Sequence, residues 1–109
     1  MNSDVSLKLL KNIESSMIGV MASSSKAKSI KKEVRLVLKI MGVSKGTNYE
    51  DAKRQMTPTE IECLLSLQRA NTTMLVLGCE YDKRKEDLGK LYQRIWLDKL
   101  TQERIMLEG

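Results

Sequence analysis

The sequence predicts an all-α fold, a small bundle or orthogonal array of four to five helices, in a single helical domain spanning residues 1–109. Apolar residues recur at three- and four-residue steps in several segments, as they do on one face of a helix. The chain holds only one proline and six glycines, which is little turn material for a strand-rich sandwich or barrel. A chain of 109 residues also has room for one core of normal size.

Two helices are predicted in the first part of the chain. The first ends at the serine run 23–25, and the second extends from about residue 26 to 41. Gly42 stands where glycine usually ends a helix. The predicted core stripe of this second helix consists of Ile30, Val34, Val37, Leu38 and Met41.

The second part of the chain predicts a short helix from Tyr49 to about Gln55 and two longer ones. The apolar run 74–79 could be a helix end or a strand. We favour a helix, because no second strand-like segment is available to pair with it. The last helix has a predicted core stripe of Leu88, Leu91, Tyr92 and Ile95. Candidate N-caps for the four capped helices are Ser3, Thr47, Thr57 and Asp82.

The residues that usually perform catalysis are scarce. The chain has no histidine, and so it lacks the commonest general base and the commonest nitrogen ligand for metals. Its glycine loop, 42–47, has three residues between the glycines instead of four and no lysine after Gly46, unlike a phosphate-binding loop. We therefore expect a non-enzymatic protein with no catalytic residues, no cofactor and no metal site.

The sequence also indicates where the protein is found. No apolar run approaches the roughly 18 residues that span a bilayer, and the N-terminus shows no cleavable signal pattern. Two cysteines, Cys63 and Cys79, are too few for a disulfide framework. These features predict a cytoplasmic or nuclear protein without a membrane span.

Positive charge is concentrated in the first half of the chain. Residues 1–54 hold 11 basic and 5 acidic side chains, whereas residues 55–109 hold 8 basic and 9 acidic ones. At about 100° per residue, five cations of the second predicted helix share an arc about 100° wide, opposite the core stripe. A second basic group lies near the start of the last helix. The predicted contact residues are Lys28, Lys31, Lys32, Arg35 and Lys39, with Lys83, Arg84 and Lys85 in the second group.

Three functions are compatible with this pattern. The leading hypothesis is a helical interaction module, a regulatory or accessory protein that contacts a protein partner through the basic face of 26–41. The alternative is a nucleic-acid-binding protein that uses the same face electrostatically. A second alternative is a self-associating structural protein, a homodimer formed through the apolar residues of 74–79 and 105–107. The basic face could also be only a solvated helix surface.

Overall fold

The predicted all-α architecture is confirmed. A computed structural model describes residues 2–109, with side chains described for Lys8 and from Lys11 onward. Helices hold 79% of the residues, and residues 2–109 contain no strand. Residues 74–76 belong to a helix, as expected. The elements are α1 (Asn2–Ser23), α2 (Ile30–Ile40), α3 (Tyr49–Gln55), α4 (Pro58–Val76), α5 (Tyr81–Leu91), the π-helical segment η1 (Tyr92–Trp96) and α6 (Leu97–Glu108).

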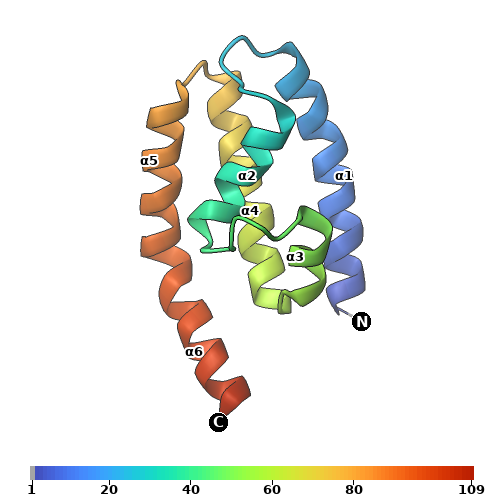
Figure 1. Ribbon diagram of the computed structural model, residues 1–109, viewed down its shortest axis with the longest axis vertical. Helices are drawn as coiled ribbons and strands as arrows, with labels where there is room; N and C mark the ends of the chain where they lie inside the picture. Colours follow the sequence, from blue (N-terminus) through green and yellow to red (C-terminus); the bar gives the residue numbers. More distant parts are fainter. Residues whose placement is uncertain (1) are drawn as a thin grey trace.

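Helix α4 is the central element of the bundle. It contacts α1, α2, α5 and α6, with α1 on one side, α5 on the other and α2 in front of it in the view of Figure 1. Segments α5, η1 and α6 form one long helix, whose C-terminal part extends beyond the other helices (Figure 1). None of the helices described is long and apolar enough to span a membrane.

Two groups of buried apolar side chains hold the helices together. Burying each such side chain contributes about 1.5–3 kcal/mol. A small group lies where α1 meets the end of α4 and consists of Met17, Met21 and Leu75. The larger group joins α2 to the remaining helices and consists of Leu36, Val37, Leu38, Ala52, Cys63, Leu64, Leu67, Leu88 and Leu100.

Of the four predicted N-caps, one is confirmed. Thr57 accepts a hydrogen bond from the Glu60 backbone, and the Glu60 side chain accepts one from the Thr57 backbone, which completes a capping box. Helix α1 already includes Ser3. Asn48 caps α3 in place of Thr47, and Glu80 precedes α5 in place of Asp82. Asparagine and threonine are both good caps, so sequence alone does not choose between neighbours.

Two residues predicted in the core are on the surface. Ile30 is 42% exposed and Ile95 is 45% exposed. Helix α2 begins only at Ile30, after the Ser29 cap, and its buried face runs through Glu33, Leu36 and Val37. Ile95 lies in η1, where the Leu97 N–H donates to the Tyr92 carbonyl, an i→i+5 bond. This wider turn displaces the side chains from the positions that a 3.6-residue period predicts.

The ends of α2 and α4 depend on glycine. Gly42 has a φ of 81° and Gly78 a φ of 80°, a left-handed conformation that glycine adopts without steric strain. At Gly42 this turn reverses the chain, so that the Val43 N–H donates to the Leu38 carbonyl. The residues after Gly42 therefore lie back against the last turns of α2.

Candidate functional site

A buried charge network occupies the inward face of α2. The Glu33 carboxylate is completely buried and pairs with the equally buried guanidinium of Arg84 through both Nη atoms. Asn71 Nδ2 donates to Glu33 Oε1 over 3.0 Å, and the Lys28 backbone N–H donates to Oε2 over 2.9 Å. Burial raises the pKa of the Glu33 carboxyl, but these hydrogen bonds and the Arg84 charge together hold it below its usual value.

Arg84 was predicted to contact a partner, and this prediction is wrong. All five of its N–H groups have acceptors inside the protein. Besides the Glu33 oxygens, Nη1 donates to Asn71 Oδ1 over 2.8 Å, Nη2 to the Lys26 carbonyl over 3.1 Å, and Nε to the Cys79 carbonyl over 3.1 Å. Its two neighbours are exposed, and Lys83 pairs with Asp87 at 3.2 Å. The Lys83-Arg84-Lys85 group is therefore divided between the core and the surface.

The other predicted contact residues surround the outward face of α2. Lys31, Lys32 and Lys39 are exposed on the helix, whereas Lys28 is exposed in the segment that precedes it. The prediction that Lys28 lies on this helix is therefore wrong, because α2 begins only at Ile30. Arg35 is half-buried: its Nη2 donates to the Val43 carbonyl over 2.9 Å, and its Nη1 is buried with no hydrogen-bond acceptor.

These cations line two adjoining hollows, which we call the basic groove. The first hollow has a volume of about 700 Å³. Exposed cations such as Lys31 form its rim, and the less exposed side chains of Val34, Leu38 and Tyr49 form its apolar floor. The second hollow has a volume of about 440 Å³ and includes Tyr81. Three residues line both hollows, namely Lys32, Arg35 and Lys45. The cations of the basic groove are Lys28, Lys31, Lys32, Arg35, Lys39 and Lys45.

Lys45 was not predicted as part of this site. It is six residues beyond Lys39 and belongs to the loop, where no helical period connects it to α2. The left-handed turn at Gly42 and the Arg35–Val43 bond return the loop to the helix. A helix-stop glycine followed by a lysine was the available signal, since such a stop folds the next residues back.

The cations of the basic groove are not paired with any carboxylate whose side chain the structure describes. Among the side chains that the structure describes, no carboxylate lines either hollow, and no carboxylate forms a salt bridge with a cation of the groove. Elsewhere such pairs are common, as in Lys26–Glu80 at 2.6 Å and Lys90–Glu86 at 3.0 Å. The groove is suited to a ligand that brings negative charge.

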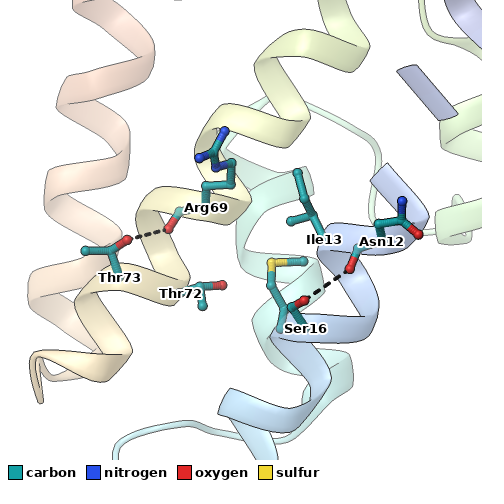
Figure 2. A pocket seen from close by; sticks show the side chains of 7 residues that line it. Asn12, Ile13, Ser16, Arg69, Thr72 and Thr73 are labelled. Carbon is teal, nitrogen blue, oxygen red and sulfur yellow. Dashed lines mark hydrogen bonds between the residues drawn. The ribbon is translucent and has the colours of Figure 1, made fainter. Parts of the chain in front are cut away.

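A third hollow lies between α1 and α4 and has a volume of about 360 Å³ (Figure 2). Its hydroxyl groups are already bonded to their own helices: Ser16 donates to the Asn12 carbonyl and Thr73 to the Arg69 carbonyl (Figure 2). Thr72 likewise donates to the Gln68 carbonyl. With its hydroxyl donors engaged and Arg69 as its one cation, this hollow offers less to a charged ligand than the basic groove.

The described residues also include acidic and cysteine side chains away from the basic groove. They contain no group of three His, Cys, Asp or Glu side chains that could hold a metal ion. Burial raises the pKa of the Cys63 thiol to about 12, which keeps it protonated and unreactive at neutral pH. Comparisons with protein family models, curated proteins and solved structures find no match for this chain.

Proposed function

We propose that this protein is a non-enzymatic regulatory or accessory protein that binds an acidic, amphipathic segment of a partner protein in the basic groove. The observation that supports this proposal is the pairing of a cationic rim with an apolar floor. Val34 and Leu38 are one turn apart on α2, with Lys31 and Arg35 beside them along the same hollow. An acidic helix or extended segment with apolar side chains complements both properties.

The apolar floor distinguishes a peptide from a nucleic acid. A phosphate backbone uses cations but gains little from Val34 and Leu38, whereas each partner leucine buried there contributes up to about 1.5–3 kcal/mol. Base stacking would need a free aromatic ring. Instead, Lys53 lies over the Tyr49 ring at 4.5 Å, and Arg84 lies over the Tyr81 ring at 5.5 Å. The geometry therefore favours a protein partner.

The test uses a labelled helical peptide in which leucine and glutamate recur at three- and four-residue steps. A scrambled peptide of the same composition controls for charge. We expect the patterned peptide to bind at least about tenfold more tightly by fluorescence anisotropy at about 0.15 M salt, where charges are screened beyond about 8 Å. If it binds no more tightly than about 100 μM, or no better than the scrambled peptide, the proposal is wrong.

Matched variants locate the binding site. Lys32→Glu/Lys45→Glu reverses two exposed charges of the groove and should weaken binding of the patterned peptide by more than tenfold. Lys11→Glu/Lys99→Glu makes the same change of net charge at exposed positions that line neither hollow, and should leave affinity nearly unchanged. Equal losses in the two variants would show a response to net charge alone and would contradict a defined groove.

Nucleic-acid binding is a second candidate function, favoured by the six groove cations without a carboxylate among them. If four or five of them contact phosphates, log affinity should fall with log salt at a slope of roughly −3 to −4.5. Random-sequence RNA and duplex DNA are titrated beside the peptides. Tighter binding of either than of the patterned peptide would favour this function over the first.

Self-association is supported by a separate observation. Val76, Leu77, Ile105, Met106 and Leu107 are all exposed, two of them at the end of α4 and three in α6. A homodimer would cover some of this surface. Sedimentation equilibrium at tens of micromolar should then show a dimer, and a species of 12.4 kDa alone would exclude it. A cytoplasmic or nuclear location also belongs to the proposal, and the two free cysteines are compatible with a reducing compartment.

A further inference from the structure

We propose that the second hollow of the basic groove is a phosphate subsite, so that the preferred partner segment carries a phosphorylated serine or threonine. This inference rests on the proposed function and specifies its ligand. The phosphate would sit among the cations of the second hollow, and the apolar residues beside it in the partner would occupy the first hollow.

The first argument is the convergence of cations from three segments. Lys32, Arg35 and Lys39 follow one another at steps of three and four residues on α2. Lys28 approaches from the segment before the helix and Lys45 from the loop after it. Five like charges around a hollow of about 440 Å³ reinforce one another's potential. A phosphomonoester, with a charge of about −1.5 to −2 and three acceptor oxygens, neutralises such a site better than one carboxylate does.

The second argument is an unused donor on Arg35. Its Nη2 bond to the Val43 carbonyl holds the guanidinium in a fixed orientation, and Nη1 is buried without an acceptor. Arg84, by contrast, uses every N–H it has. A phosphate oxygen would supply the missing acceptor. Nη1 is covered in the free protein, and the long lysine side chains around the hollow can rotate to admit the ligand.

The third argument is that the two hollows adjoin. Lys32, Arg35 and Lys45 line both, so that one ligand can place a phosphate in the second hollow and apolar side chains in the first. A phosphorylated peptide has both parts within a few residues. Inorganic phosphate lacks the apolar part, and a nucleic acid lacks aliphatic side chains.

The experiment compares three labelled peptides that differ at one position, which holds phosphoserine, glutamate or serine within the same leucine- and glutamate-containing sequence. We expect the phosphoserine peptide to bind the wild-type protein about tenfold more tightly than the glutamate peptide at pH 7. Because a phosphomonoester has a second pKa near 6, this advantage should shrink at about pH 5.5. The glutamate peptide, whose carboxylates titrate near 4.3, should change little.

Two matched variants separate the hollows. Lys39→Gln removes an exposed cation that lines only the second hollow. It should weaken binding of the phosphoserine peptide severalfold more than binding of the glutamate peptide. Lys31→Gln removes an exposed cation from the same helix, and this cation lines only the first hollow. It should weaken binding of both peptides equally. Arg35→Lys keeps the positive charge but replaces the guanidinium, with its two Nη groups, by a single amine. It should reduce the affinity advantage of the phosphoserine peptide over the glutamate peptide.

Each outcome decides between the proposals. If the phosphoserine and glutamate peptides bind within about twofold of each other, the phosphate subsite is wrong and the proposed peptide groove stands. If no peptide binds more tightly than about 100 μM, both are wrong. If random-sequence RNA binds more tightly than the phosphoserine peptide and displaces it, the cations serve a nucleic acid and the phosphopeptide inference is overturned.

Discussion

Helix α2 carries charged side chains on two faces, and the structure uses them in opposite ways. On the inward face, the Glu33 carboxylate is fully buried and accepts hydrogen bonds from Arg84, Asn71 and the Lys28 backbone. On the outward face, Lys31, Lys32 and Lys39 are exposed, and no described carboxylate pairs with them. A charge is buried on α2 only where its partner is built into the fold. Unpartnered charge is instead available for a ligand.

Breaking the inward pair should have the largest effect. Arg84→Met leaves the Glu33 carboxylate buried without its cation and should lower the free energy of unfolding by about 3–5 kcal/mol. Urea denaturation followed by circular dichroism measures this loss. Lys85→Met, at an exposed neighbouring position, should change stability by less than about 0.5 kcal/mol.

A double variant shows whether the loss belongs to the pair. In Glu33→Leu/Arg84→Met both charges are gone, and the protein should recover much of the stability lost in Arg84→Met alone. If the two substitutions have simply additive effects, the two side chains do not stabilise each other, and the contrast between the faces of α2 fails.

Truncation of the apolar core should have an effect of similar or slightly smaller size. Leu64 is completely buried, and Leu64→Ala should destabilise the protein by about 2–5 kcal/mol. Ile95→Ala, at a side chain that is 45% exposed, should destabilise it by less than about 1 kcal/mol. If the two variants lose equal unfolding free energy in the same urea titration, Ile95 is buried in the core and the geometry of η1 is wrong.

Acid should lower the free energy of unfolding by protonating the Glu33 carboxylate. The Glu33 pKa is lower in the folded protein than in the unfolded chain, so its contribution is complete above the ordinary carboxyl pKa, near 4.3. That contribution is lost as pH falls through the lowered folded value. The free energy of unfolding of the wild-type protein should therefore fall more steeply than that of Glu33→Gln below about pH 4.5. Parallel curves would show that Glu33 does not titrate in the expected way.

Charge reversal on the outward face should have the smallest effect on stability. Lys32→Glu/Lys45→Glu breaks no side-chain bond that the structure records, and Glu at position 32 lies in the first turn of α2, where an acid is favourable. The free energy of unfolding should stay within about 0.5 kcal/mol of wild type, while affinity for the patterned peptide falls by more than tenfold. A loss above about 2 kcal/mol would mean that these lysines support the fold.

Much of the fold could be predicted because its signals are local. The capping box at Thr57, the stop at Gly42 and the bounds of α3 each depend on a few neighbouring residues. The error at Ile95 arose because a single π-helical turn changes the period without a clear mark in the sequence.

The site was predicted only in part, for a different reason. Glu33 stands among lysines and Arg84 between two lysines, so both resemble surface residues. Their pairing joins positions 51 residues apart, and no local period reports it. Lys45 was missed because it reaches the basic groove only through the chain reversal after α2. Sequence period identifies a face of one helix, whereas these contacts depend on how separate segments cross.

The bonds of Arg84 join segments that leave the ribosome at different times. Its guanidinium bonds the Lys26 carbonyl, 58 residues earlier, as well as Glu33 and Asn71. While only α1 to α4 have left the ribosome, docking α2 onto α4 would desolvate the Glu33 carboxylate with no cation to neutralise it. The nascent segment therefore gains little by closing early. We therefore expect α2 to pack stably onto α4 only once α5 has emerged and its arginine can pair with Glu33.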